Sequence, residues 1–312
     1  MRVVVLMSTY QGEKFVAEQI ESILNQLPRD GRLIVRDDGS LDRTVNIIQS
    51  FADPRIEITC GSNVGFARSF FSLMAAAPTD AEMIMLSDQD DVWLPQKIER
   101  AWQHLKDTDG VPTLYCARQQ LVNETLHPIA LSKRCLRPPS FQNALTENIV
   151  TGCTAAFNRD ALHLALQIKM PERVYFHDWW LYLVVAAFGK VIVDEEATIL
   201  YRQHARNVIG RGAGVGQYVE ILRFLRKTSW IHIMYSQIEQ FGIAYTSRLS
   251  PLQRQLIEKY FNPRQVSSAS RLVFSFKRFR QSLLDDILLR GLLVVAVTSG
   301  RGLLNTPARV TQ

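Results

Sequence analysis

Short apolar runs alternate with amphipathic segments over the first 106 residues of the chain. Four runs rich in β-branched or large apolar side chains predict strands at residues 3–8, 33–36, 56–59 and 83–87. Four amphipathic segments predict helices at residues 13–26, 42–50, 65–77 and from Pro95 to about residue 106. This alternation is the pattern of βαβ units. Because the strands are apolar almost throughout, we expect an α/β fold with a mainly parallel, Rossmann-like sheet and helices on both faces.

The α/β pattern continues to residue 202 with longer interruptions. After a break at 107–112, a strand at 113–117 leads into a polar connection with prolines at 128, 138 and 139. The elements expected beyond it are an apolar segment at 149–157, helices from residue 159 and at 178–188, and strands at 191–193 and 198–202. Glycines at positions 210, 212, 214 and 216 then indicate a mobile loop.

Beyond residue 217 the pattern changes to successive helices, in which Leu, Ile and Phe alternate with Arg and Lys. We therefore expect an α/β domain over residues 1–214 and a helical, basic C-terminal region over residues 215–312. Segments 222–227 and 274–293 have the composition of amphipathic helices that lie on an anionic membrane surface. The same segments equally fit a helical unit that packs on the first domain and leaves its basic face in water.

The composition excludes several classes of protein and leaves the partner open. With 47% apolar and 21% charged side chains, the 312-residue chain is neither wholly disordered nor collagen-like nor a disulfide scaffold. A net charge of +6, concentrated in the tail, should attract an anionic partner such as lipid, nucleotide or nucleic acid. Nucleic acid is the less favoured of these, because no nucleic-acid-binding module accompanies the charge.

Cysteine spacing and apolar run lengths bear on the cellular compartment. Cys60, Cys116, Cys135 and Cys153 lie far apart without a zinc-site spacing, so we expect reduced and mostly buried thiols. The first apolar run is a strand rather than a signal peptide. The apolar stretch 287–298 is interrupted by an arginine and is shorter than the roughly 18 residues that a spanning helix needs. We expect a cytoplasmic protein, with contact to the inner face of the cell membrane.

Polar residues follow four of the expected strands. In open parallel sheets the ligand binds at the carboxyl ends of the strands, so these four places should converge on one cleft. They are residues 8–10 (Ser-Thr-Tyr), 36–40 (Arg-Asp-Asp-Gly-Ser), 87–91 (Ser-Asp-Gln-Asp-Asp) and 201–204 (Tyr-Arg-Gln-His).

Two pairs of aspartates within these places suggest chemistry. Asp88 and Asp90 project to one side of an extended chain, about 6.6 Å apart at the backbone, and can share Mg²⁺ or Mn²⁺. Alternatively, this acidic turn caps the next helix, but three clustered carboxylates repel one another without a cation. In the Asp37-Asp38 turn one acid suffices for capping, which leaves the other to accept hydrogen bonds from a nucleobase or ribose.

Seven motifs together carry a family resemblance. They resemble, in order and spacing, the motifs of family 2 glycosyltransferases with the GT-A fold, and most closely those of the rhamnosyltransferase-like branch. The resemblance covers about residues 1–210, and any single motif would be weak support. The motifs are STYQGEKFVAEQIESILNQ, VRDDGSLDRT, NVGFARSF, MLSDQDDVWLPQKIE, TGCTAAFNRD, FHDWW and YRQHARNVIG.

The resemblance implies inverting, metal-dependent transfer from a nucleotide-diphosphate sugar. Asp88 and Asp90 match the DxD motif, with Asp90 a ligand of Mg²⁺ or Mn²⁺ and Asp88 close to both the cation and the donor. His204 matches a histidine that completes the metal shell, and Asp91 serves the sugar hydroxyls or fixes the loop. The base, ribose and diphosphate of the donor would be held by Thr9, Tyr10, Asp37, Asp38, Asn63, Gly65 and Arg68. For Arg68 a surface salt bridge is an equal alternative.

The FHDWW motif matches the position of the catalytic base. His177 replaces the first acid of the usual pair, which leaves Asp178 as the base and His177 as a side chain that could tune it. Alternatively, Asp178 only caps the helix that follows. The helix N-terminus lowers the pKa of an aspartate and burial beside Trp179 and Trp180 raises it, so the sequence leaves the balance open.

The resemblance suggests rhamnose, from dTDP-rhamnose, as the transferred sugar and a surface polysaccharide or lipid-linked oligosaccharide as the acceptor. The proline-containing connection after residue 117 would face the acceptor. Trp180 could stack on a sugar or belong to the core, and Trp93 should pack inside. Alternatives are a UDP-hexose or UDP-N-acetylhexosamine transferase and a catalytically silent scaffold that holds a nucleotide or glycan. A phosphohydrolase is disfavoured, because no aspartate ends the first strand.

Overall fold

The computed structural model describes residues 1–167, 174–204, 230–263 and 265–298. The strands are β1 (Val3–Thr9), β2 (Arg32–Asp37), β3 (Ile56–Cys60), β4 (Met83–Ser87), β5 (Val92–Trp93), β6 (Thr113–Val122), β7 (Pro128–Leu131), β8 (Ala156–Asn158) and β9 (Lys190–Arg202). The helices are α1 (Val16–Leu24), α2 (Thr44–Ser50), α3 (Phe66–Ala75), α4 (Lys97–Leu105), α5 (Phe141–Ala144), the 3₁₀ turn η1 (Gly152–Thr154), α6 (Arg159–Leu166), α7 (His177–Phe188), α9 (Trp230–Ala244), α10 (Pro251–Phe261), α11 (Val266–Val273) and α12 (Leu283–Thr298).

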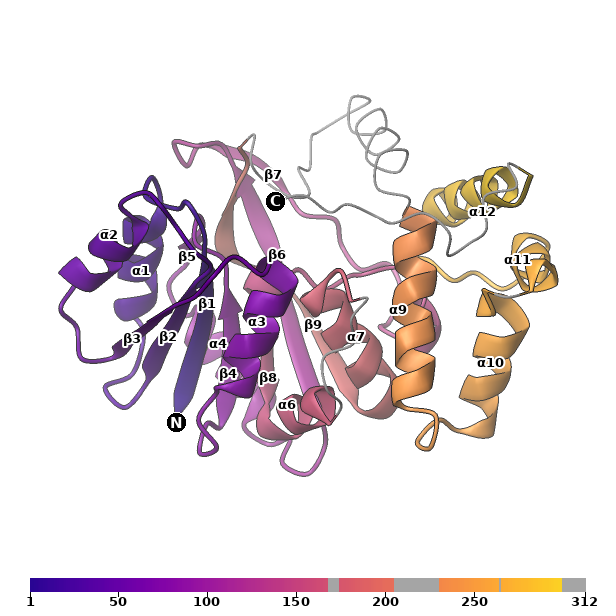
Figure 1. Ribbon diagram of the computed structural model, residues 1–312, viewed down its shortest axis with the longest axis horizontal. Coiled ribbons are helices and arrows are strands. Elements are labelled where there is room, and N and C mark those ends of the chain that lie inside the picture. Colours follow the sequence, from indigo (N-terminus) through magenta and orange to yellow (C-terminus); the bar gives the residue numbers. More distant parts are fainter. Residues whose placement is uncertain (168–173, 205–229, 264, 299–312) are drawn as a thin grey trace.

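One mixed sheet runs through the molecule in the order β3-β2-β1-β4-β8-β6-β9-β5, with β7 paired to β6 (Figure 1). The strands β3, β2, β1 and β4 are parallel, and so are β6 and β9, whereas β8 is antiparallel to both of its neighbours. In Figure 1, β1 rises from the N-terminus at the bottom, so the carboxyl ends of the first strands lie at the upper side. This places the four polar segments at one edge of the sheet.

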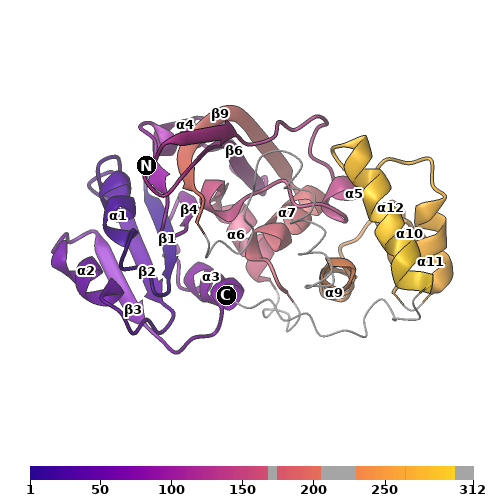
Figure 2. The same cartoon turned by 90° about the horizontal axis from the view of Figure 1, so that it is seen from above.

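Both faces of the sheet are covered, as the apolar strands predict. Along β1, Val4 and Leu6 join the core under α3, α6 and α7, while Val3, Val5 and Met7 join the core under α1 and α4. Figure 2 shows the first strands between α1 on one side and α3 on the other. The two side-chain directions of a buried strand thus serve two separate apolar layers.

A close approach of two chain segments ends α7 and starts β9. A side chain at Gly189 would place its Cβ 2.0 Å from the carbonyl oxygen of Pro112, so only glycine fits there. The Lys190 amide then donates to that same carbonyl at 2.8 Å, which starts the parallel pairing of β9 with β6. This junction fixes α7 against the sheet.

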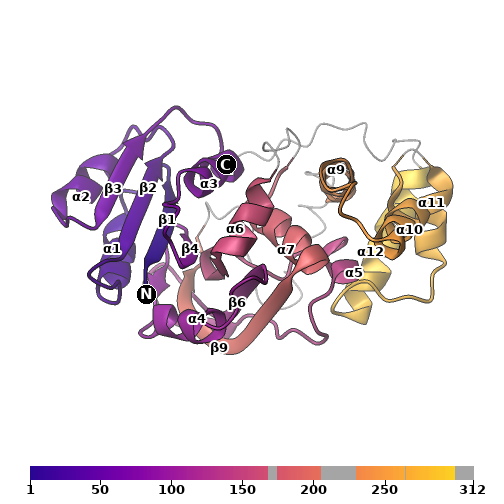
Figure 3. The ribbon, with the colours of Figure 1, turned by 90° about the horizontal axis from the view of Figure 1, so that it is seen from below.

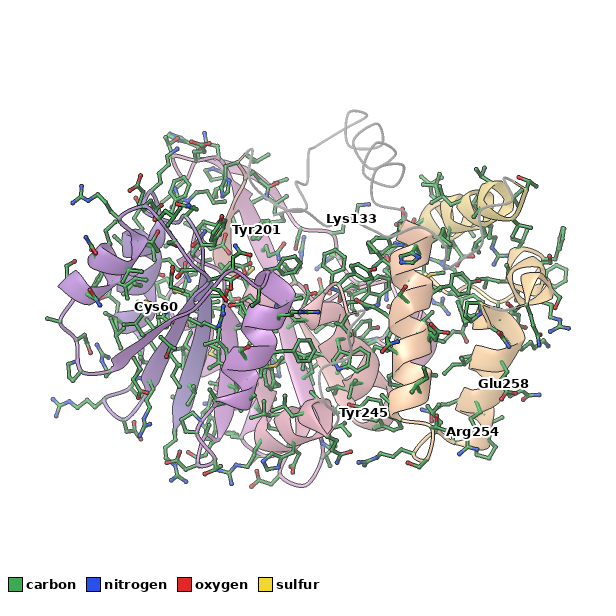
Figure 4. All side chains as sticks on the ribbon, viewed as in Figure 1. Cys60, Lys133, Tyr201, Tyr245, Arg254 and Glu258 are labelled. Atoms are coloured by element: carbon green, nitrogen blue, oxygen red, sulfur yellow. The ribbon has the colours of Figure 1, made fainter. Side chains whose placement is uncertain are left out.

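The helical region packs on α7 through aromatic side chains. Trp230 of α9 stacks on Trp179 of α7 with ring centroids 4.8 Å apart. At the other end of α9, the Tyr245 hydroxyl donates to the carbonyl of Leu164 in α6 at 2.7 Å, and Figure 4 labels Tyr245 at this lower end. Figure 3 shows α9 end-on between α7 and the group formed by α10, α11 and α12. One apolar core extends from the sheet to α12.

The α/β fold expected from the sequence is confirmed, with several local corrections. The segments 191–193 and 198–202 form one strand, β9, because Asp194 between them is bound by Arg100 and Tyr115 and the register shift is absorbed there. Part of the proline-containing connection pairs as β7, and β5 was not expected. The glycine-rich segment, the expected boundary near residue 215 and segment 222–227 lie outside the described residues.

The buried side chains correct two further expectations. Trp180 is fully buried between Phe241 and Tyr245, so its ring is a core side chain and offers no face to a sugar, while Trp93 is buried as expected. The four thiols are free, but Cys60 is exposed at the end of β3 and Cys135 is half-buried. No described helix is both long enough and apolar enough to cross a membrane.

Candidate active site

The loops after β1 and β2 form one hydrogen-bonded unit around Asp37. Its carboxylate accepts from the Thr9 hydroxyl at 2.8 Å, from the Ser40 hydroxyl at 2.6 Å, and from the amides of Gly39 and Ser40. Gly39 has a φ of +89° in this turn, which favours glycine. A Cβ at this position would lie 3.1 Å from the backbone nitrogen of Asn63. The predicted positions Thr9, Asp37 and Asn63 therefore come together, with Asp37 and Thr9 buried.

Asp38 links the loops after β2 and β3. Its carboxylate accepts from the amides of Val64 and Gly65, each at 2.9 Å, and forms an ion pair with Arg36. Gly65 takes a φ of +85° just before α3, which turns both amides toward the carboxylate. The expectation that one acid of the pair is free is wrong here, because the protein itself engages both. Arg68, in the first turn of α3, is exposed.

Gln89 ties the aspartate loop to the first strand. Its side-chain amide accepts from the Tyr10 amide at 2.8 Å and donates to the Tyr10 carbonyl at 2.9 Å, so it pairs with Tyr10 as a neighbouring strand would. A Cβ at Gly12 would lie 2.2 Å from Gln89 Oε1, which explains the glycine. Gln89 thus sets the position of the loop that carries Asp88 and Asp90.

Asp88, Asp91 and Cys153 form a cluster whose ligand atoms all lie within 4.8 Å of one another. Burial, with the charges of Asp90 and Asp178, raises the pKa of Asp88 to about 7. Burial and the charges of Asp90 and Asp88 raise the pKa of Asp91 well above its usual range. Asp91 Oδ2 is buried without a hydrogen-bond partner, although Oδ1 accepts from the Arg202 amide. An unpartnered buried carboxylate oxygen is costly and suits a nearby cation.

The donor atoms of this edge suit a hard cation better than a soft one. Burial raises the pKa of Cys153 well above its usual range, so the thiol keeps its proton and acts as a hydrogen-bond donor. Carboxylate oxygens are the ligands that Mg²⁺ and Mn²⁺ prefer. The residues present therefore fit the expected Mg²⁺ or Mn²⁺.

His204 and Asp90 meet as the sequence predicts. Nε2 of His204 lies 2.7 Å from Oδ2 of Asp90. The imidazole ring stacks on the Phe15 ring, with the two ring centroids 5.5 Å apart. Arg202, two residues earlier and almost fully buried, donates to the Asp90 carbonyl at 2.8 Å and packs over Phe15 at 4.3 Å. Asp90 and His204 thus face each other, whereas Asp91 and Cys153 surround Asp88.

Lys97 supplies a buried positive charge behind the acids. Its ammonium lies over Trp93 at 5.0 Å and 3.3 Å from the Thr198 hydroxyl. Burial lowers the pKa of Lys97 to about 8, against the opposing influence of Cys153 and Asp91. This ammonium offsets part of the negative charge of the cluster from inside the protein.

Asp178 stands at the N-terminus of α7, within electrostatic reach of Asp88. Its carboxylate accepts from the Trp179 amide at 2.7 Å and the Gly152 amide at 3.1 Å. Burial raises the pKa of Asp178 to about 6, although these two amides and Asn148 lower it. Burial therefore has a larger influence on the pKa of Asp178 than its hydrogen bonds have. Asp178 is close enough to Asp88 for its charge to raise the pKa of that carboxyl.

His177 packs beneath Asp178 without a hydrogen bond. Its ring stacks on Phe70 with centroids 4.0 Å apart, and neither ring nitrogen has a hydrogen-bond partner. Burial lowers the pKa of His177 to about 3, which keeps the ring neutral. His177 therefore brings no charge and no hydrogen bond to Asp178, and its tuning of Asp178 stays a prediction. Gly152 packs closely against the His177 ring, since a Cβ at position 152 would lie 2.8 Å from His177 Nε2.

Comparison with known proteins identifies the family. The profile of glycosyl transferase family 2 matches residues 4–164, just over half of the chain. The chain belongs to glycosyl transferase family 2. Its match to the dTDP-rhamnosyl transferase RfbG of Shigella flexneri is 26% identical over 227 residues and covers 65% of this chain and 73% of that protein. An uncharacterized glycosyltransferase of Nostoc sp., alr2836, is 24% identical over 219 residues, with 66% of each chain covered.

Solved structures agree with the fold of this family 2 glycosyltransferase. S. aureus TarS 1-349 in complex with UDP-GlcNAc superposes with a TM-score of 0.57 at 13% identity, over 96% of this chain and 92% of that chain. The mannosyltransferase PcManGT from Pyrobaculum calidifontis, in complex with GDP-Man and Mn²⁺, gives a TM-score of 0.51 at 17% identity, over 96% and 86%. The expected GT-A fold is thereby confirmed.

The sequence analysis assigned no individual role to several residues of the glycosyltransferase site. Their contacts join segments from 26 to 184 positions apart, and no local pattern predicts such a contact. For all of them except Asn148, which lies outside the seven motifs, only their place within the motifs could have pointed to them. They are Arg36, Gln89, Lys97, Asn148, Cys153 and Arg202.

Proposed function

We propose that this glycosyltransferase is inverting and metal-dependent, and that it moves rhamnose from dTDP-rhamnose to a saccharide or lipid-linked saccharide acceptor of a surface polysaccharide. The observation that carries the proposal is the position of Asp178, a carboxylate with a pKa of about 6 that interacts electrostatically with Asp88. The similarity to a dTDP-rhamnosyl transferase supports the choice of donor.

Asp178 serves as the general base. The acceptor hydroxyl oxygen attacks the anomeric carbon while the bond from that carbon to the diphosphate oxygen breaks, and the diphosphate leaves with the electron pair. The hydroxyl proton passes to Asp178, whose raised pKa makes it a stronger base than an exposed aspartate while it stays ionised at neutral pH. A single displacement inverts the anomeric centre and needs no covalent intermediate.

The carboxyl end of β4 holds the cation in this proposal. Asp88 and Asp90 are its carboxylate ligands, and His204, which already faces Asp90 at 2.7 Å, completes the set. A bound Mg²⁺ or Mn²⁺ neutralises the charge of the departing diphosphate. Asp91, with one buried oxygen unpartnered, orients the loop or a sugar hydroxyl.

The donor lies along the loops after β1, β2 and β3. Thr9, Tyr10, Asp37 and Asp38 shape the walls for base and ribose, and because both acids are engaged by the protein, they act chiefly by fixing those loops. The exposed Arg68 guanidinium neutralises diphosphate charge. The remaining contacts come from Asn63 and Gly65.

The proposal also covers the organisation and location of the enzyme. Residues 1–214 form the glycosyltransferase domain, and residues 215–312 form a helical region that contacts the membrane. The enzyme acts in the cytoplasm at the inner face of the cell membrane, where a lipid-linked acceptor is within reach.

Calorimetric titration of the full chain tests donor and metal together. The titrants are dTDP-rhamnose and UDP-glucose, each with and without Mn²⁺, and UDP-GlcNAc serves as a third donor. We expect binding of dTDP-rhamnose that weakens at least tenfold without Mn²⁺. Preferred binding of a UDP-sugar would replace the donor assignment, and binding of no donor at all would favour a silent scaffold.

A further inference from the structure

The loop between α11 and α12 exposes two phenylalanines. Phe274 has 81% of its surface exposed and Phe276 is fully exposed, although Phe279, a few residues on, is buried in the core. Phe274 and Phe276 line the same surface hollow, so the two rings form one apolar projection. We call residues 274–277 the phenylalanine loop.

The phenylalanine loop is held in place by a buried ion pair. The Arg290 guanidinium donates to the carbonyls of Val273, Ser275 and Lys277 at 2.5–2.9 Å, and it pairs with Asp286 at 2.7 Å. Asp286, itself almost fully buried, accepts from the amides that follow the loop. These contacts hold the loop so that both rings are exposed. Binding therefore does not have to order the loop, which would cost conformational entropy.

The outer face of α12 continues this apolar surface. Leu283, Leu284, Ile287, Val294 and Val295 recur at helical spacing and are all exposed, whereas the opposite face holds buried side chains. Arg290 lies at the edge between the two faces, so the phenylalanine loop that it binds adjoins the outer face. An exposed apolar surface of this extent marks a contact with another surface.

Cations surround the apolar projection. Lys259, Arg271 and Lys277 line a hollow of about 520 Å³ together with the two exposed phenylalanines. From residue 230 to residue 298 the sequence has nine Lys and Arg but four Asp and Glu. A rim of cations around apolar side chains is complementary to anionic phosphates above a hydrocarbon layer.

We propose that the phenylalanine loop and the outer face of α12 bind the surface of an anionic lipid bilayer. The rings of Phe274 and Phe276 insert among the acyl chains, and Lys259, Arg271 and Lys277 bind lipid phosphates. Figure 1 shows α12 at the upper side of the molecule, and the carboxyl ends of β1 and β2 lie on this side as well. The proposed function includes a membrane contact, and this inference names the surface that makes it. Only the link to a lipid-linked acceptor rests on the proposed function.

Vesicle co-sedimentation of the full chain tests the surface without donor. The vesicles are pure phosphatidylcholine, or phosphatidylcholine with phosphatidylglycerol, at low and high salt. We expect wild-type binding to phosphatidylglycerol vesicles, weakened by salt, and at least a tenfold loss for the double variant F274S/F276S. The charge variant R271E/K277E should lose binding comparably. The control is L41S/L252S, which removes two equally exposed leucines elsewhere and should bind as wild type.

Three outcomes would overturn the proposal. They are no wild-type binding, equal binding by F274S/F276S and wild type, and a wild-type dimer that F274S/F276S dissociates, which would make a second copy the occupant. Circular dichroism confirms that each variant is folded. Donor calorimetry on the same samples separates the two proposals. If the protein binds vesicles but does not bind dTDP-rhamnose, only the donor assignment is removed.

Discussion

Asp178 shows how one carboxylate acquires the properties of a base. The amides of Gly152 and Trp179 favour its ionised form, and burial disfavours it, with a resulting pKa of about 6. The sequence identifies the residue through the FHDWW motif and the helix start. It cannot weigh the two influences, because burial here depends on packing with segments far away in the chain.

The pKa of Asp178 predicts an acid limb in the rate. A base must be deprotonated, and because burial raises this pKa above the usual aspartate value, protonation begins as the pH falls through about 6. With cation and donor saturating, we expect kcat to fall about tenfold per pH unit below pH 6. Transfer rates measured from pH 5 to 8 would contradict this if they stayed constant down to pH 5.

Gly152→Ala should displace the base without touching the donor loops. The new Cβ would lie 2.8 Å from His177 Nε2 and 3.7 Å from Asp178 Cβ, so the start of α7 must shift. We expect kcat to fall about 10- to 100-fold with donor Kd nearly unchanged. Gly242→Ala in α9, where no atom lies within 4 Å of the new Cβ, is the matched control. Equal kcat for both variants would remove Gly152 from this role.

The strand β9 carries the site through its last residues. Arg202 at its end binds the carbonyls of Asp90 and Glu124 and the Glu18 carboxylate, which joins segments more than 70 residues apart. The sequence predicts that this segment lies beside the aspartate loop, because strand ends meet at one edge of a sheet. It does not predict which side chain braces the loop, since that depends on three distant acceptors.

Replacing Arg202 with Lys should loosen this brace. Lysine keeps the charge but loses the planar fork, so at least two of the hydrogen bonds are lost. We expect the free energy of unfolding to fall by about 2–3 kcal/mol and Mn²⁺-dependent donor binding to weaken. Urea unfolding and calorimetry measure both. Arg134→Lys, in an exposed pair with Glu195, should change stability by under about 0.5 kcal/mol.

At the scale of the whole molecule, the apolar core on the α7 side of the sheet extends into the helical region, and the core on the α1 side is separate from it. The alternation of apolar strands and amphipathic helices over the first 106 residues predicts a sheet that is covered on both faces. The structure confirms this prediction. The pattern of α12 does not predict its orientation, because Leu, Ile and Val occur on every side of that helix. Only tertiary contacts, such as the Asp286–Arg290 pair, determine which side faces outward.

The shared core predicts a single unfolding transition. Phe241 of α9 is fully buried against Trp180 and Phe188 of the glycosyltransferase domain. We expect Phe241→Ala to lower the free energy of unfolding by about 3–4 kcal/mol, with one transition by both fluorescence and circular dichroism. The exposed Phe276→Ala is the control and should change stability little. Two separate transitions would indicate that the helical region unfolds independently.

The most direct test of the central claim compares Asp178→Asn with wild type in donor binding and in transfer. We expect donor Kd within about threefold of wild type and a loss of about 10²- to 10⁴-fold in kcat, because only the proton acceptor is removed. Asp109→Asn, an exposed acid, controls for the loss of charge. A kcat for Asp178→Asn equal to that of wild type would contradict the assignment of Asp178 as the base.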